Sequence, residues 1–103
     1  NLVVIMLRSA GFEVIDLGID CELQKYRDAV IKDGAQAILA SALLTTTMPY
    51  MKTIVDGFAD MPHVKIIIGG APITEGYMRE IGAHGTAKDA AAAVTVTRQL
   101  LCA

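Results

Sequence analysis

Short apolar segments of strand length alternate with amphipathic segments of helix length along the whole chain. The clearest strand is VKIIIGGA at residues 64–71, and Gly34 separates a charged amphipathic stretch from the apolar AQAILASAL at residues 35–43. A chain in which strands and helices alternate predicts βαβ units with right-handed crossovers. We therefore expect one α/β domain over residues 1–103, a parallel sheet with helices on both faces.

Glycines, caps and apolar periodicity give the bounds of the expected elements. Helices are expected over residues 2–10, 21–34, 48–60, 74–82 and 90–103, and strands over residues 12–18, 35–43, 64–71 and, more weakly, 85–89. The expected helix caps are Gly11 and Gly34 at C-terminal ends and Thr47, Thr74 and Asp89 at N-terminal ends.

The charge and hydropathy of the chain argue against nucleic-acid and membrane partners. The chain is 53% hydrophobic and 19% charged, which suits strands that are buried on both faces. Its net charge is −2 and it has no basic patch, so we expect no nucleic-acid partner. No apolar run reaches the ~18 residues that span a membrane, so we expect no membrane partner. Cys21 and Cys102 lie far apart without CxxC spacing, which favours free thiols and a cytoplasmic protein.

Small and hydroxyl-bearing residues follow the expected strands at their carboxyl ends. Gly18 ends the first strand, SALLTTT at residues 41–47 ends the second, and Gly69 and Gly70 end the third. Ligands of open parallel sheets bind at this edge, and small residues leave the backbone open to close approach. Each feature also has a plain structural reading, a turn for the glycines and an N-cap with spare hydroxyls for the threonines. Together they indicate a binding slot.

Catalytic and phosphate-binding patterns are missing from the sequence. It contains no GxGxxG, no GxxxxGK[ST], no HExxH and no Ser/His/Asp set, so we expect no catalytic residue. His63 and His84 both precede expected strands. They should therefore be surface loop residues at the end of the sheet away from the slot.

The quoted segments resemble the cobalamin-binding domain of corrinoid methyl-carrier proteins that partner methanol, methylamine and related methyltransferases, and the corresponding domain of cobalamin-dependent methionine synthase. The family's Ser-x-Leu and Gly-Gly marks match Ser41-Ala42-Leu43 and Gly69-Gly70. GFEVIDLGID, SALLTTTMPYM and IIGGAPIT are similar to the family along nearly their whole length. The resemblance covers essentially the whole chain and implies a flavodoxin-like (Rossmann-like) sheet.

The resemblance also implies a cofactor, cobalamin or a related corrinoid, whose nucleotide tail is buried in the domain of the full-length protein. It implies that Ser41 hydrogen-bonds a nitrogen of the buried base, that Leu43 packs beside the base, and that Gly69 and Gly70 let the tail pass against bare backbone. The further contacts that it implies come from Thr45, Thr46, Asp89 and Ala90.

The function that the resemblance implies is that of a carrier, which is not catalytic alone. Such a domain shuttles a methyl group on cobalt between methyl-donor and methyl-acceptor methyltransferase proteins. The cofactor performs the chemistry, while the protein binds and orients it.

One family mark is absent. Asp-x-His-x-x-Gly, whose histidine is the lower axial ligand of cobalt, does not occur here, and neither does the first strand that precedes it. That strand is central in a 2-1-3-4-5 sheet. We therefore expect no metal ligand from this chain, weak or no corrinoid binding, and exposed strand edges. Three explanations stay open: truncation of a longer protein, which we favour, a second copy that fills the gap, or direct closure of the remaining strands.

Other functions stay open as alternatives. The chain could be a non-catalytic flavodoxin-like interaction module, or an inactive fragment that folds without activity. A cobalamin-dependent mutase domain shares the fold, but LLTTTMPYM is more similar to the methyl carriers. A phosphoacceptor receiver would need an acidic cluster to accompany Lys88, and the sequence shows none.

Overall fold

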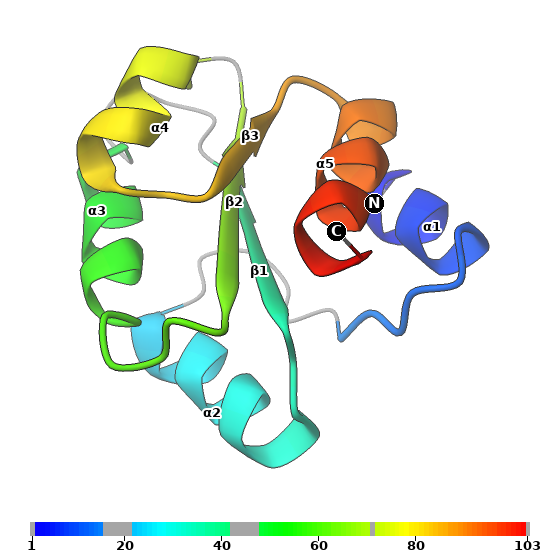
Figure 1. Cartoon of the computed structure of the whole chain (residues 1–103), viewed down its shortest axis with the longest axis horizontal. Helices are drawn as coiled ribbons and strands as arrows, with labels where there is room; N and C mark the ends of the chain where they lie inside the picture. The colour runs from blue at the N-terminus through cyan, green and yellow to red at the C-terminus, as the bar shows by residue number, and fades with distance from the viewer. Residues whose placement is uncertain (1, 16–21, 42–47, 71, 103) are drawn as a thin grey trace.

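The computed structural model describes residues 2–15, 22–41, 48–70 and 72–102, and these form a three-stranded parallel sheet with five helices (Figure 1). The elements in chain order are α1 (Leu2–Ser9), α2 (Leu23–Asp33), β1 (Ala37–Ser41), α3 (Met48–Asp56), β2 (Lys65–Gly69), α4 (Glu75–Ile81), β3 (Gly85–Ala87) and α5 (Ala90–Cys102). The strand order is β1-β2-β3, and both pairings are parallel. The α/β fold class is thereby confirmed.

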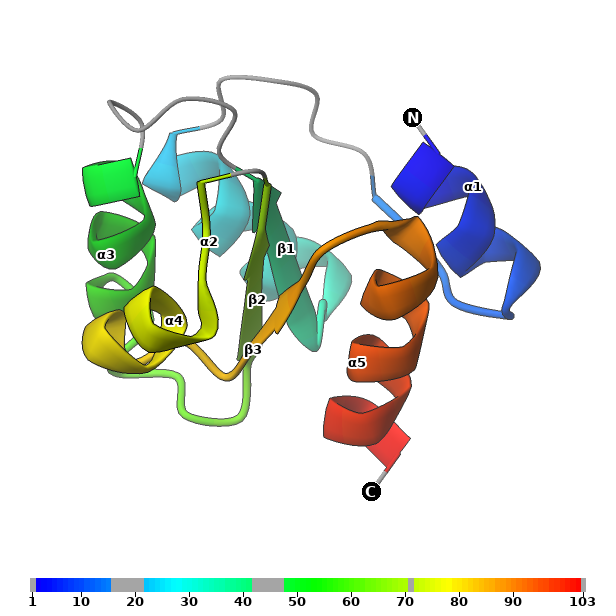
Figure 2. The same ribbon diagram turned by 90° about the horizontal axis from the view of Figure 1, so that it is seen from above.

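Helices cover both faces of this sheet, as the alternating pattern predicts. Helices α2, α3 and α4 lie on one side, and α1 and α5 lie on the other (Figures 1 and 2). Helix α1 packs mainly against α5, whereas α5 itself contacts β2 and β3.

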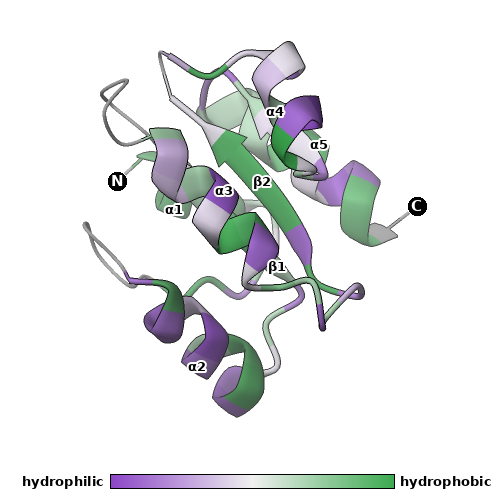
Figure 3. Cartoon of the chain, turned by 90° about the vertical axis from the view of Figure 1, so that its left-hand side faces the viewer, coloured by the Kyte–Doolittle hydropathy of each residue, from purple (hydrophilic) through white to green (hydrophobic). Residues whose placement is uncertain are grey.

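The core is built around β2, which is hydrophobic along most of its length (Figure 3). Val64 and Ile68 are 0% exposed and Ile66 is 1% exposed. Ile66 and Ile68 belong to the cluster under α2, α3 and α4. On the other face α5 lies so close to β3 that a Cβ on Gly85 would stand 2.7 Å from a methyl group of Val96. Ile67 of β2 lies near this same contact and is 2% exposed, so the central strand is buried on both faces.

The helix ends follow the local signals in the sequence. Gly11 has a φ of +97° and Gly34 a φ of +69°, both in the left-handed region that favours glycine. Thr74 caps α4 by accepting from the Tyr77 N–H, and Asp89 caps α5 by accepting from the Ala92 N–H. These four predicted caps are confirmed, and Thr47 lies outside the described residues.

The strand expected over residues 12–18 is wrong where it can be checked. Residues 12–15 form no strand, and residues 16–18 lie outside the described part of the chain. A strand needs a neighbour that pairs with it. Within the described residues β1 pairs with β2 alone, and residues 12–15 do not pair with its other edge. Among the described residues, direct closure of the strand expected over residues 12–18 onto β1 is therefore absent at residues 12–15.

A surface hollow of about 510 Å³ lies beside this segment. It is lined by one residue in the last turn of α1, by four consecutive residues after that helix and by one residue at the end of α2, namely Arg8, Phe12, Glu13, Val14, Ile15 and Asp33. A guanidinium nitrogen of Arg8 donates to the Val14 carbonyl at 3.1 Å, which holds the turn after α1 in place.

Within the described ranges, no helix is long and apolar enough to cross a membrane.

Candidate functional site at the carboxyl edge of the sheet

The three strands end level with one another. Ser41 at the end of β1 is in register with Gly69 at the end of β2, and Gly69 is in register with Ala87 at the end of β3. Helices α3, α4 and α5 all begin on this side of the sheet (Figures 1 and 2). The parallel strands therefore bring Ser41 and Gly69, from separate parts of the sequence, to one edge, as expected.

Ser41, Gly69 and Gly70 give this edge its open character. Ser41 is exposed, and the two glycines are half-buried. Gly70 has a φ of +116°, which favours glycine, and its carbonyl accepts from the Ile73 N–H in the turn that leads to α4.

Gly69 has a second reason to lack a side chain. A Cβ at this position would lie 2.7 Å from the carbonyl oxygen of Ala87 in the neighbouring strand. The close approach of β3 thus already requires glycine here, whatever ligand the edge binds.

The other predicted contacts divide into two groups. A carboxylate oxygen of Asp89 accepts from the Ala92 N–H at 2.7 Å, and Ala90 is buried at the start of α5. Both stand at the same edge, but each also has a role in the fold. Leu43, Thr45 and Thr46 lie outside the described residues.

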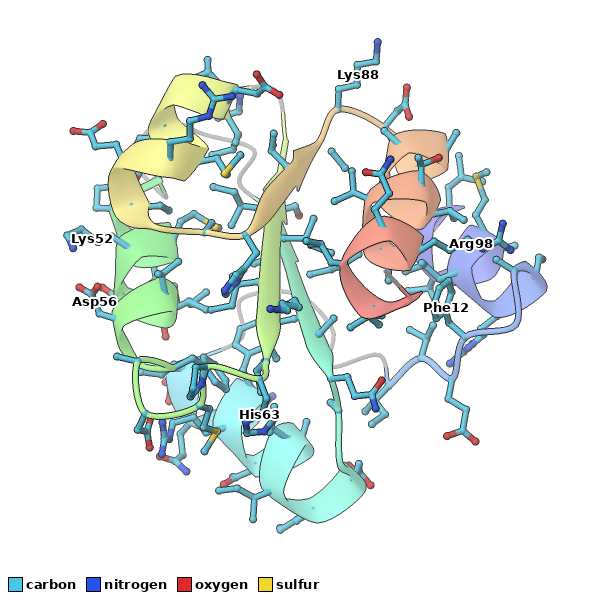
Figure 4. All side chains as sticks on the ribbon, in the orientation of Figure 1. Phe12, Lys52, Asp56, His63, Lys88 and Arg98 are labelled. Atoms are coloured by element: carbon cyan, nitrogen blue, oxygen red, sulfur yellow. The ribbon has the colours of Figure 1, made fainter. Side chains whose placement is uncertain are left out.

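Two tyrosines and a lysine at this edge were not predicted as site residues. The Tyr77 hydroxyl donates to the Met48 carbonyl at 2.6 Å, and the Tyr50 hydroxyl accepts from the Leu23 N–H at 2.5 Å. Lys88 projects outward from the edge (Figure 4). The tyrosines share one signal that could have identified them, because each is the third residue of a helix that begins at this edge.

The histidines lie away from this edge, as predicted. His63 is exposed at the opposite end of the sheet (Figure 4). The His84 ring accepts from the Ile66 N–H through Nδ1 at 2.9 Å, near the start of β2. Partial burial of the ring, followed by the charge of Lys65, lowers the pKa of His84 below its ordinary value of 6.5. Within the described ranges, no group of three His, Cys, Asp or Glu side chains could hold a metal ion.

Acid should weaken the fold through His84. Because the pKa of His84 is lowered in the folded chain, the unfolded chain binds the proton more readily. This contribution to stability is complete above pH 6.5 and is lost as the pH falls through the lowered pKa. We expect the thermal unfolding midpoint of His84→Asn to fall less than that of the unsubstituted chain between about pH 7.5 and about pH 5.5, a range that spans the ordinary histidine pKa. The matched variant His63→Asn should keep the full drop; equal drops in all three proteins would contradict this assignment.

The described edge residues fit a large ligand that carries hydrogen-bonding groups. An exposed serine hydroxyl stands beside two consecutive glycines, so a ligand can reach both a side-chain donor and bare backbone. In the part of the chain that the structure describes, this edge offers no group of acidic, histidine or cysteine side chains that could hold a metal ion.

Comparison with known families decides the assignment. A family model described as the B12 binding domain matches residues 1–95. The chain belongs to the B12-binding domain family. Among its relatives, dimethylamine corrinoid protein 3 of Methanosarcina mazei is 39% identical over 106 residues, a match that covers 98% of this chain and 62% of the relative. Dimethylamine corrinoid protein 1 of Methanosarcina acetivorans is 36% identical, with 98% of this chain and 49% of the relative covered.

Solved structures of a corrinoid protein and of a cobalamin methyltransferase complex contain the same fold as this chain. The monomethylamine corrinoid protein of Methanosarcina barkeri matches with a TM-score of 0.90 and 33% identity, over 97% of this chain and 50% of that one. The methanol:cobalamin methyltransferase complex MtaBC from the same organism contains a chain that matches with a TM-score of 0.89 and 26% identity, over 99% of this chain and 40% of that one. The chain therefore spans about half the length of the proteins that it matches. Membership of this family supports cobalamin or a related corrinoid as the cofactor of the full-length protein.

Proposed function

We propose that this domain is the corrinoid-binding part of a methyl carrier, which moves a methyl group between methyl-donor and methyl-acceptor methyltransferases in the cytoplasm. The main support for the proposal is the carboxyl edge of the sheet, where the exposed Ser41 is in register with Gly69. In this proposal the domain is not catalytic alone. Its relatives are named as dimethylamine and monomethylamine corrinoid proteins, and MtaBC is named as a methyltransferase complex, which supports methyltransferases as partners.

The proposal gives each edge residue a role. Ser41 donates to a nitrogen of the nucleotide base, and Gly69 and Gly70 leave room for the nucleotide tail. Leu43, Thr45 and Thr46 line the tail, and Asp89 and Ala90 lie beside it at the start of α5. When bound, the corrinoid supplies the cobalt that carries the methyl group; these residues bind the cofactor and fix its orientation.

We also propose that copies of this chain associate through the free edge of β1. The Lys65 N–H donates to the Gln36 carbonyl, and in a parallel ladder alternate residues bond to the same neighbour. The backbone groups of Ala37, Leu39 and Ser41 therefore point away from β2. Within the described residues no strand pairs with them, and unpaired strand edges are templates for pairing with another chain.

Titration of hydroxocobalamin, followed by visible absorbance, tests the carrier proposal. It compares this chain with an extended form that carries an upstream strand and the Asp-x-His-x-x-Gly segment. We expect the extended form alone to bind with sub-micromolar affinity and the spectral shift of histidine ligation. A control in which the histidine of that segment is replaced by alanine should bind without the shift. Light scattering on the same samples should show dimers of this chain and monomers of the extended form.

Each other outcome has a definite meaning. Sub-micromolar binding by this chain alone would show that the upstream segment is not needed. If neither form binds hydroxocobalamin, the carrier proposal fails and a non-catalytic interaction module becomes the preferred function. If both forms are monomers, the edge of β1 is not a contact between copies.

A further inference from the structure

Two tyrosine hydroxyls join the first turns of three helices at the carboxyl edge of the sheet. Tyr77 in α4 donates to the carbonyl of Met48, the first residue of α3, at 2.6 Å. Tyr50 in α3 accepts from the N–H of Leu23, the first residue of α2, at 2.5 Å. The two bonds link α4 to α3 and α3 to α2 in series, across residues that are far apart in the sequence.

The bond from Leu23 replaces a missing helix cap. The first N–H groups of a helix have no partner within the helix and are usually satisfied by a side chain at the N-cap. In α2 the N-cap residue is Glu22, and its side chain makes no capping hydrogen bond. The Tyr50 hydroxyl, which comes from another helix, supplies the acceptor instead. The start of α2 is therefore positioned by α3 rather than by its own sequence.

The bond to Met48 acts at the start of α3, which follows residues 42–47 in the sequence. On one side Ser41 is the last residue of β1, in register with Gly69 of β2. Met48 is fixed on the other side by Tyr77, whose backbone N–H is itself held by the Thr74 cap. Thr45 and Thr46, which we propose to line the nucleotide tail, lie between these two points in the sequence. The Tyr77 bond thus ties Met48 to α4, in addition to the buried packing of α3 against the core.

We propose that Tyr77 and Tyr50 are positioning residues for corrinoid binding, which hold the first turns of α3 and α2 at the width that the nucleotide tail requires. This role rests on the proposed function. Neither tyrosine needs to touch the cofactor, because each acts through the helix end that it bonds. Removal of the hydroxyl leaves the ring in place and releases only that helix end.

The test uses Tyr77→Phe and Tyr50→Phe in the extended form, with hydroxocobalamin and cobinamide as probes. Cobinamide has the corrin ring but lacks the nucleotide tail. We expect Tyr77→Phe to weaken hydroxocobalamin binding by about five- to tenfold, as for one lost hydrogen bond, and cobinamide binding by less than about twofold. Tyr50→Phe should have a smaller effect in the same direction, since it acts on α2. The matched control is Ile54→Val, which removes a buried methyl group of α3 and lowers the unfolding midpoint without touching either hydroxyl.

The alternative outcomes separate this role from a merely structural one. If Ile54→Val weakens hydroxocobalamin binding as much as Tyr77→Phe does, or if Tyr77→Phe weakens both probes equally, the positioning role is wrong while the carrier proposal stands. If the unsubstituted extended form binds neither probe, both proposals fail together. Hydrogen exchange without ligand tests the bonds themselves: Tyr50→Phe should speed exchange of the Leu23 amide in this chain, and unchanged exchange would overturn the link between α3 and α2.

Discussion

Replacement of Ile68 by alanine should lower the free energy of unfolding by about 2–5 kcal/mol. Ile68 is 0% exposed in the central strand, within the cluster under α2, α3 and α4. Truncation removes buried apolar surface and leaves a cavity that the sheet and helices close only in part. Since domains of this size are stable by about 5–15 kcal/mol, this single change removes a large share of the stability. Urea unfolding followed by circular dichroism measures the change.

The chain provides a matched control for this substitution. Ile31 in α2 is 65% exposed, so Ile31→Ala should change the free energy of unfolding by no more than about 0.5 kcal/mol. Similar losses for Ile31→Ala and Ile68→Ala would contradict the burial of β2 that the structure describes.

Gly69→Ala should cost about 1–3 kcal/mol of stability, even in the absence of any corrinoid. The added Cβ would lie 2.7 Å from the Ala87 carbonyl oxygen. That oxygen belongs to the backbone of β3 and cannot rotate away, so β3 must shift relative to β2. The measurement is again urea unfolding of the ligand-free chain.

Gly76→Ala is the control for this second change. A Cβ at Gly76 meets only the Thr74 hydroxyl oxygen at 3.8 Å, an ordinary contact. Alanine favours a helix over glycine, so Gly76→Ala should leave stability unchanged or raise it by up to about 1 kcal/mol. If Gly69→Ala were as stable as the unsubstituted chain, the lack of a side chain at Gly69 would serve the ligand alone.

Features that depend on nearby residues could be predicted from the sequence. The cap at Gly34 needs only a left-handed residue after a helix, and the caps at Thr74 and Asp89 need only a side-chain oxygen before one. The meeting of Ser41 and Gly69 at one edge follows from the rule that parallel strands end on the same side. These predictions are confirmed because a few neighbouring residues, or one topological rule, determine each of them.

Features that depend on distant partners could not be predicted in the same way. Residues 12–15 have the alternation of a strand, but alternation does not provide the neighbour with which a strand must pair. The hydrogen bonds of Tyr50 and Tyr77 join residues 27 and 29 positions apart, respectively. The contact between Gly69 and the Ala87 carbonyl likewise depends on how closely β3 approaches β2. The local sequence contains no signal for these distances.

The two edge strands of the sheet, β1 and β3, differ in a way that limits the pairing of further copies. β1 has five residues, whereas β3 has three. Before β3 begins, the His84 ring already occupies the Ile66 N–H that a longer strand would use. Short edge strands and occupied backbone groups discourage further pairing. A molecule with one strand edge that can pair joins a second copy through that edge. The resulting dimer then has no such edge left. Fibres need two pairing edges on every unit, so we expect the association that we propose through β1 to end at the dimer.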